Sequence, residues 1–215
     1  IVIDYMNRII NSSARMTRLI DELLTFSRLS INSFFELTDM NEVMGEVLSD
    51  LELMIKEKGA VIEVDSLPQM EVVPGQMRQV FQNIISNALK FTRPDVHPHI
   101  KINCEIVSHC NLKAARSADG TCVRITIGDN GIGFDEQYAQ KIFTIFQRLH
   151  SRERYEGTGI GLAITKKIIE KHNGHITAHS KEGEGATFIL VLPISQAAVE
   201  PLNPETVEQP ASRLN

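Results

Sequence analysis

The stretch NIISNALKFT, residues 83–92, has the periodicity of a helix with two different faces. Its apolar side chains suit a buried face: Ile84, Ile85, Ala88 and Leu89. Spacings of three and four residues place the remaining side chains together on a second face: Asn83, Asn87, Lys90 and Phe91. Asparagine disfavours helices, and its amide needs hydrogen-bond partners. The second face is therefore either an ordinary solvated surface or a surface that binds a ligand.

The chemistry of this face favours a ligand. A solvated helix face more often carries Glu and Lys than two asparagines. The carbonyl oxygen of an asparagine is a hard ligand suited to Mg²⁺, and a lysine one turn further along can meet phosphate oxygens as a point charge.

The whole chain sets the limits within which this helix is interpreted. Its 215 residues are enough for one core and an appendage. The net charge of −5 argues against nucleic acid as a partner. No apolar run approaches the roughly 20 residues that a membrane helix needs, and no signal peptide is visible. We therefore expect no membrane contact from these residues. The start at Ile1 rather than Met predicts a fragment, which leaves a membrane anchor elsewhere in the full-length protein open.

Three cysteines, Cys104, Cys110 and Cys122, have no C-x-x-C spacing. Neither a zinc site nor a disulfide framework is indicated. We expect reduced thiols in a cytoplasmic protein.

Residues 1 to about 30 form one predicted amphipathic helix. Its apolar positions recur at three or four residues, interrupted by Ser13: Val2, Met6, Ile9, Met16, Ile20 and Leu23. Such a helix would extend about 45 Å, which is long for packing on a compact domain. Its apolar side suits pairing with another helix in a bundle or dimer, although an ordinary surface helix stays open.

The rest of the chain alternates predicted strands and helices. We expect strands at FFEL, AVIEVD, HIKINCEIV, CVRITIGD, HITAHS and ATFILVLPI. We expect helices at 41–58 with Asn41 as N-cap and Gly59 as stop, from about Pro74, near Glu136, and at 158–174. A hairpin loop is predicted near 111–120, and the Pro-containing tail from Gln196 is predicted to be disordered. This order predicts an α+β fold with helices on one face of a mixed sheet.

Three further segments carry glycines where a ligand would need them. In GDNGIGF (128–134), Asp129 ends an apolar strand and Gly131 and Gly133 follow; the segment is either a tight turn or an acceptor for an amino group such as that of adenine. In EGTGIGLAI (156–164), the glycines lead directly into an apolar helix. The free N–H groups at the N-terminus of this helix predict an anion site. This is neither a Walker A loop nor a dinucleotide fingerprint. GEGATF (183–188) is typical of a hairpin turn.

A fourth segment, IFTIFQRLHSRERY (142–155), combines two phenylalanines with several basic residues. That composition predicts a mobile lid with an apolar anchor and arginines able to reach phosphate.

Taken together, these segments resemble the sensor histidine kinases of two-component systems, which share an ATP-binding superfamily with gyrase-type and heat-shock chaperone ATPases. NIISNALKFT resembles the N box, DNGIGF, GTGIGLAI and GEGATF the three glycine boxes, and IFTIF the F box, in the family's order. RMTRLIDELLTFSRLS (15–30) is similar to the second helix of the dimerisation and phosphoacceptor domain. The resemblance implies a two-layer Bergerat-type (HATPase, GHKL) fold after one long helix. It divides the chain into a truncated dimerisation hairpin at 1–31, an ATP-binding domain at 32–195 and a tail at 196–215.

The resemblance also implies roles for individual residues. Asn87 would coordinate Mg²⁺ with support from Asn83, Lys90 would contact phosphate, and Phe91 would pack near adenine or ribose. Asp129 would accept from the adenine amine, with Thr187 assisting through a water. Asn87 and Lys90 are the expected catalytic residues. The expected ATP contacts also include Gly131, Gly133, Phe146, Gly157, Thr158, Gly159, Ile160, Gly161 and Leu162, with Arg148 or Arg152 meeting the γ-phosphate.

The implied activity is phosphoryl transfer from ATP to a protein histidine. Hydrolases of the superfamily typically carry a Glu where this chain has Asn83, which cannot accept a proton at neutral pH. A GHKL-type ATPase and a degenerate signalling module without kinase activity remain alternatives. No histidine here stands in the family's acceptor pattern, and His172 and His175 suit helix caps or the surface. The acceptor is therefore expected outside this chain. The implied partners are a second copy, through the N-terminal helix, and a response-regulator receiver domain.

Overall fold

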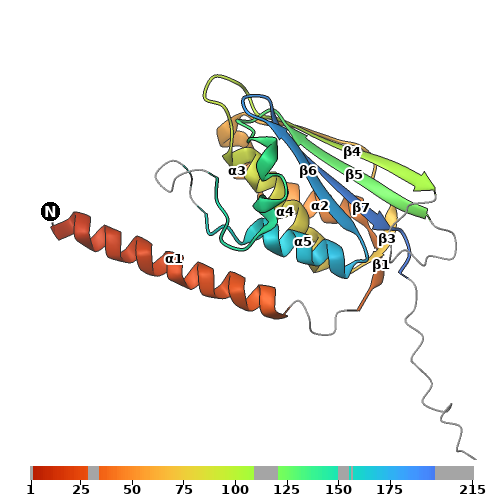
Figure 1. Ribbon diagram of the computed structural model, residues 1–215, viewed down its shortest axis with the longest axis horizontal. Helices are drawn as coiled ribbons and strands as arrows, with labels where there is room; N and C mark the ends of the chain where they lie inside the picture. The colour runs from red at the N-terminus through yellow and green to blue at the C-terminus, as the bar shows by residue number, and fades with distance from the viewer. Residues whose placement is uncertain (1, 29–33, 109–120, 150–154, 156, 197–215) are drawn as a thin grey trace, which may run out of the picture.

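The computed structural model describes residues 2–28, 34–108, 121–149, 155 and 157–196. Figure 1 shows a twisted sheet with helices on one face and a long N-terminal helix, α1, beside this body. The sheet has the order β2-β4-β5-β7-β6, in which β2 pairs parallel with β4 and the other pairs are antiparallel. The strands are β2 (Val61–Val64), β4 (His99–Ser108), β5 (Thr121–Asp129), β6 (His175–Lys181) and β7 (Gly185–Pro193). The predicted α+β sandwich with a mixed sheet is confirmed.

The core lies between this sheet and the helices α4 (Pro74–Lys90) and α5 (Gly161–Lys171). The inward positions of the sheet alternate along each strand, so Ile125 faces Leu190 and Ile127 faces Phe188 across the β5–β7 pair. The predicted apolar face of α4 is confirmed, because Ile84, Ile85 and Leu89 are completely buried and Ala88 is nearly so. The polar face of α4 is thereby directed away from the core, toward the end of β5.

A small second sheet pairs β1 (Glu36–Asp39) with β3 (Gln69–Val72) in antiparallel register. The strand predicted at FFEL begins only at Glu36, and β3 was not predicted. The missed strand has four residues, too few for alternation to stand out.

The predicted helix 41–58 is two helices, α2 (Met40–Asp50) and α3 (Glu52–Lys58), which meet at the buried Leu51. Its N-cap is Asp39 rather than Asn41, because the Asp39 carboxylate accepts the Asn41 N–H at 2.8 Å. The Asn41 side chain instead pairs with both backbone groups of Leu67. The predicted stop at Gly59 is confirmed by its left-handed conformation.

The helix α5 ends at Lys171, three residues before the predicted stop at Gly174. His172 caps this end and is completely buried, so it is a cap but not a surface residue. Its Nε2 accepts the Val73 N–H at 3.0 Å, and its Nδ1 lies 2.8 Å from the Ile168 carbonyl oxygen. Burial lowers the pKa of His172. The neutral imidazole therefore joins the end of α5 to the start of α4.

The short helix predicted near Glu136 is a 3-10 helix, η1 (Glu136–Tyr138), and a second one follows it, η2 (Lys141–Phe143). Gln196 was predicted to be the first residue of a disordered tail, but it is hydrogen-bonded to Glu71 and His172, so the prediction is wrong at this residue. The rest of that tail and the predicted hairpin loop at 111–120 lie outside the described residues.

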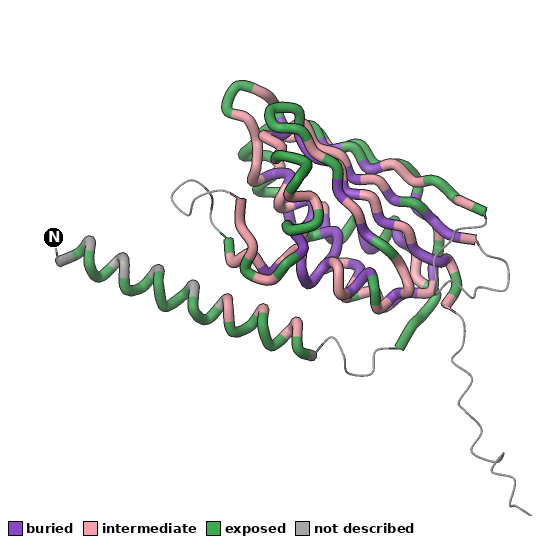
Figure 2. Tube along the Cα trace, in the orientation of Figure 1, coloured by how far each residue is buried: buried purple, intermediate pink, exposed green. Residues whose placement is uncertain are grey.

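The predicted N-terminal helix is confirmed as α1 (Val2–Arg28). Figure 2 shows that most of its described positions are exposed, in contrast to the buried helices under the sheet. In the described part of the chain, no helix combines the length and apolar character needed to cross a membrane. Cys104 is a free thiol, whereas Cys122 is disulfide-bonded, so the expectation of reduced thiols is wrong at Cys122.

Candidate functional site

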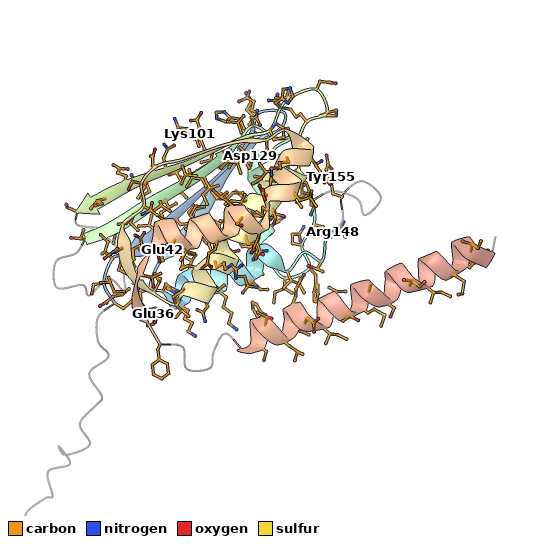
Figure 3. The ribbon with its side chains drawn as sticks, turned by 180° about the vertical axis from the view of Figure 1, so that it is seen from behind. Glu36, Glu42, Lys101, Asp129, Arg148 and Tyr155 are labelled. Atoms are coloured by element: carbon orange, nitrogen blue, oxygen red, sulfur yellow. The ribbon has the colours of Figure 1, made fainter. Side chains whose placement is uncertain are left out.

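A cavity of about 840 Å³ opens between α4, the end of β5 and the start of α5. Twelve of the residues expected to contact ATP line it: Asn83, Asn87, Lys90, Phe91, Asp129, Gly133, Arg148, Gly157, Thr158, Gly159, Gly161 and Leu162. Figure 3 shows Asp129 nearer to Tyr155 and Arg148 than to Glu36 and Glu42, which lie on the opposite side of the body. The fold thus brings together segments that are far apart in the sequence, from Glu22 to Phe188.

Four expected contacts do not line the cavity. Gly131 is buried behind it, and Ile160 is completely buried in the core. Phe146 is 61% exposed and has a positive φ of 64°, so it is not packed as an apolar anchor here. Thr187 lies on β7 opposite Gly128. Arg152 falls outside the described residues, as does the rest of the predicted lid between 150 and 154.

Asp129 ends β5 at the floor of the cavity. Its Oδ1 accepts the Gly131 N–H at 2.8 Å and the Ala186 N–H at 3.3 Å. Burial raises the pKa of Asp129, while these two hydrogen bonds act in the opposite direction. A partly desolvated carboxylate held in this way can accept a hydrogen bond from an amino group that enters the cavity.

The glycines around Asp129 serve contacts between backbone segments. A Cβ at Gly131 would lie 2.3 Å from the Phe91 carbonyl oxygen, so α4 and this loop touch directly. The adjoining Ile132 N–H donates to the same oxygen at 2.9 Å. A Cβ at Gly133 would lie 2.1 Å from the Lys181 carbonyl oxygen. These glycines were expected to let the backbone approach a base; the structure shows that they let the motif loops approach one another.

Asn83 joins the polar face of α4 to the start of α5. Its Nδ2 donates to the Gly161 carbonyl oxygen at 3.0 Å and to Thr165 Oγ1 at 3.3 Å. Thr165 in turn donates to the Gly161 carbonyl oxygen at 3.0 Å. Asn83 therefore holds the glycine-rich segment against α4, one turn from Asn87.

An aromatic and cationic group forms another wall of the cavity. The ring of Tyr155 lies 4.9 Å from the ring of Phe91, centroid to centroid. Lys90 Nζ lies 4.3 Å from the Phe91 centroid, and a Cβ at Gly157 would lie 3.0 Å from Nζ. Tyr155 was not expected in the site, because its position depends on how the chain between 146 and 157 returns to α4.

Arg148, within the segment expected to be a lid, is hydrogen-bonded to residues at and just after the C-terminal end of that segment. Its guanidinium donates to the Gly157 carbonyl oxygen at 2.9 Å and to the Tyr155 carbonyl oxygen at 2.7 Å. The Phe146 N–H donates to the Gly159 carbonyl oxygen at 2.9 Å, so the backbone of this segment contacts the glycine-rich segment as well. In this structure Arg148 organises the glycine-rich segment while lining the cavity.

Two more residues near the site were missed by sequence reasoning. Arg93 donates from Nε to the Asn130 carbonyl oxygen and from NH1 to that of Gly183, both at 2.9 Å. It thereby ties the end of α4 to two glycine loops. Glu22 of α1 lines the cavity and accepts a hydrogen bond from Thr158 Oγ1. Neither is marked by its local sequence, because the carbonyls and hydroxyl they contact are distant along the chain.

The donor set suits a metal only as part of a larger complex. Within the described residues, no group of three or more His, Cys, Asp or Glu side chains converges as a metal site. Asn87 lines the cavity and offers one amide oxygen. Mg²⁺ usually keeps several waters and is held by one or two protein ligands plus substrate phosphates. The cavity therefore fits Mg²⁺ that arrives with a phosphate-bearing ligand.

Comparison with known proteins places these features in a family. Residues 72–196 match the family described as histidine kinase-, DNA gyrase B-, and HSP90-like ATPase. The phytochrome-like protein Cph1 of Synechocystis sp. is 41% identical over 192 residues, which cover 89% of this chain and 24% of that protein. The sensor protein kinase WalK of Staphylococcus saprophyticus is 35% identical over 187 residues, which cover 83% of this chain and 28% of that protein. The chain thus spans about a quarter of the length of these curated relatives.

Solved structures agree with the fold. The catalytic domain of the histidine kinase ThkA, in a nucleotide-free form, matches with a TM-score of 0.60 at 27% identity, over 75% of this chain and 96% of that domain. ThkA in complex with the response regulator protein TrrA matches with a TM-score of 0.63 at 24% identity, over 88% of this chain and 50% of that one.

Proposed function

The chain belongs to the histidine kinase-, DNA gyrase B- and HSP90-like ATPase family, and from this membership we propose that it is the ATP-binding catalytic part of a sensor histidine kinase. In the proposed reaction, the γ-phosphoryl group of ATP passes to a histidine on a dimerisation helix outside these residues. A response-regulator aspartate then receives it.

The observation that carries the proposal is the convergence of Asp129, Asn87 and Lys90 on one cavity. Asp129 is the acceptor for the adenine amine, and its fixed orientation by Gly131 and Ala186 makes the contact specific. Lys90 supplies a positive charge toward the phosphates, beside the glycine-rich segment. Phe91 and Tyr155 offer flat apolar surface for the nucleoside. Asn83 supports the site through Gly161.

The state of Asn83 favours transfer over hydrolysis. A hydrolase needs a general base that takes a proton from water, and an amide has no such capacity at neutral pH. The Asn83 amide is moreover committed to Gly161 and Thr165. A kinase needs no protein base of this kind, because the acceptor imidazole is itself the nucleophile.

The protein's part in such a transfer is positioning and charge neutralisation. Mg²⁺, held by Asn87 and the phosphates, would neutralise charge on the transferring group. Lys90 orients the phosphates, and the N–H groups at the start of α5 offer them an anion site. Arg148 holds the start of the glycine-rich segment in place through its hydrogen bonds to the carbonyl oxygens of Gly157 and Tyr155.

The proposed partners follow from the family. We propose that α1 pairs with a second copy in the intact protein and that a receiver domain is the phosphoryl acceptor, as ThkA is found in complex with a response regulator. The location is proposed to be cytoplasmic. The domain bounds at 1–31, 32–195 and 196–215 stay predictions, with α1 falling within the first of them.

The test is calorimetric titration of the 215-residue chain with AMPPNP, a non-hydrolysable ATP analogue, with and without Mg²⁺. Asp129→Asn should weaken binding about 100-fold, because the amide also presents donors to the adenine amine. Asn87→Ala should remove the effect of Mg²⁺.

Because burial raises the pKa of Asp129, acidification should protonate its carboxylate. The affinity for AMPPNP should therefore begin to fall at a pH above the usual aspartate pKa of about 4.

Asp95→Asn is the matched control, since Asp95 is exposed and does not line the cavity. A circular dichroism melt separates lost binding from lost folding. Asp129→Asn should melt no lower than the wild type, because the ionised carboxylate is the form that burial disfavours. Absence of AMPPNP binding, with or without Mg²⁺, by both the folded wild-type chain and a variant with the cavity-lining Glu22 changed to Gln would overturn the proposal and leave a degenerate module. Rapid hydrolysis of ATP without an acceptor would favour the ATPase alternative.

A further inference from the structure

The helix α1 reaches the nucleotide cavity through one short face. Leu19, Glu22 and Phe26 share this face, because their spacings are three and four residues. Leu19 and Phe26 pack against the core, and Glu22 lines the cavity between them. Lys167 of α5 donates to the Phe26 carbonyl oxygen at 2.8 Å and lies 4.1 Å above the Phe26 ring. The carboxylate of Glu22 is therefore held at the cavity by contacts on both sides of it.

The partner of Glu22 is the hydroxyl of Thr158, which donates to its Oε2. Thr158 lies in the glycine-rich segment that leads into α5. Its hydroxyl oxygen is 3.4 Å from the Ile160 nitrogen. Within α5 itself, the first turn has no acidic residue, and the N-cap residue Ile160 makes no side-chain hydrogen bond. A negative charge near this end is favourable, and here it comes from a different helix.

We infer that Glu22 sets the affinity for nucleotide phosphates by engaging Thr158 and placing its negative charge where those phosphates would lie. The inference rests on the proposed function and concerns regulation of the same cavity. In the proposed site a triphosphate would use the Thr158 hydroxyl and the N-terminus of α5, which line the cavity, and its charge has the same sign as that of Glu22. Docking of α1 and binding of a triphosphate therefore oppose one another. Reciprocity requires that a bound triphosphate also loosens α1.

The size of the effect depends on the charge of the ligand. Repulsion between a carboxylate and a phosphate increases with each phosphate added. Adenosine, which has no phosphate, should be insensitive to Glu22. A merely structural role of Glu22 would instead change all three affinities, for adenosine, ADP and AMPPNP, in the same direction.

The test uses the full 215-residue chain and two matched variants. Glu22→Gln keeps the shape and an acceptor for Thr158 but removes the charge. Asp21→Asn makes the same change of charge at the neighbouring, exposed position of α1. In titrations of Glu22→Gln, affinity should rise about tenfold for AMPPNP, roughly threefold for ADP and not at all for adenosine. Asp21→Asn should match the wild type with all three ligands.

Hydrogen–deuterium exchange of residues 19–26 provides a second readout. AMPPNP should accelerate exchange in the wild type, because ligand and carboxylate compete. Adenosine should leave exchange unchanged. Slower exchange with AMPPNP would overturn the inference, because the ligand would then favour docking.

The outcomes separate the two proposals. Wild-type binding of AMPPNP with an unchanged or weaker affinity of Glu22→Gln overturns this inference alone, as does an equal gain in Asp21→Asn. Failure of both the wild type and Glu22→Gln to bind any of the three ligands overturns the nucleotide site and the inference together. Binding of AMPPNP by Glu22→Gln but not by the wild type would support both.

Discussion

The helices α1 and α4 are both amphipathic, but only α4 has its apolar face covered. Ile84 of α4 is completely buried, whereas Ile9 of α1 is 66% exposed. Figure 2 shows the same contrast along the two helices. The apolar residues recur at helical spacing in both sequences. Periodicity therefore identifies a face that avoids water, but it does not identify what covers that face.

The two helices are also tied differently to the rest of the molecule. Arg93, just after α4, reaches two backbone carbonyl oxygens on separate glycine loops. Lys167 holds α1 through Phe26, by a hydrogen bond to its carbonyl oxygen and a cation–π contact with its ring. An element that carries the site is thus fixed at several points, while the element beside it has few contacts. Low contact density of this kind accompanies local opening.

The largest expected effect comes from a matched pair of core deletions. Ile84→Ala should lower the free energy of unfolding by about 3 kcal/mol, because it leaves a cavity under the sheet. Ile9→Ala should change it by less than about 0.5 kcal/mol, since its side chain is already exposed. Urea denaturation followed by circular dichroism measures both. An equal loss in the two variants would show that α1 is packed as tightly as α4.

A smaller effect is expected from the anchor of α4. Arg93→Gln should lower the free energy of unfolding by about 1–2 kcal/mol, because one partly buried and one exposed hydrogen bond are lost. It should also weaken AMPPNP binding, since the loops of Asn130 and Gly183 lose their common tie.

Arg93→Lys is the control for this anchor. A lysine keeps the charge but cannot reach two carbonyls with a planar fork. It should restore part of the stability and less of the affinity. Full recovery of both by Lys would show that charge alone, and not the double hydrogen bond, is what Arg93 contributes.

A still smaller effect on stability than that of Arg93→Gln is expected from the anchor of α1. Lys167→Met keeps an unbranched apolar side chain but removes the hydrogen bond to Phe26 and the cation above its ring. The free energy of unfolding should change by less than about 1 kcal/mol. Hydrogen exchange at residues 19–26 should nevertheless accelerate. Unchanged exchange there would mean that the packing of Leu19 and Phe26 and the Glu22–Thr158 hydrogen bond hold α1 without Lys167.

Long, strongly patterned elements could be predicted from the sequence. The buried face of α4, the apolar strands and the left-handed stop at Gly59 follow from local spacing and local backbone geometry. The strand β3 could not be predicted, because four residues carry little periodic signal and become a strand only by pairing with β1. The break at Leu51 was missed for a related reason, since the apolar spacing continues from α2 into α3.

The candidate site was predicted in its residue types but not in its contacts. Asp129, Asn87 and the glycines stood out because their chemistry is unusual for a helix face or a strand end. Glycine is required at 131 and 133 because the backbone of another segment lies too close for a Cβ, and no local pattern reveals such a contact. Glu22, Arg93 and Tyr155 were missed, because each sits among ordinary charged or aromatic residues, and its contacts with the site come from segments distant along the chain.

By itself, the sequence determined the class of the fold, the identity of the buried helix faces and the set of unusual polar groups, because each is encoded over a few turns or a few residues. Only the tertiary structure decided that these groups share one cavity, that Asn83 joins two of its walls, that Arg93 ties two glycine loops together, and that Glu22 of α1 lines the cavity. The physical reason is that a hydrogen bond depends on distance in space, and folding brings together atoms whose separation along the chain no local pattern records.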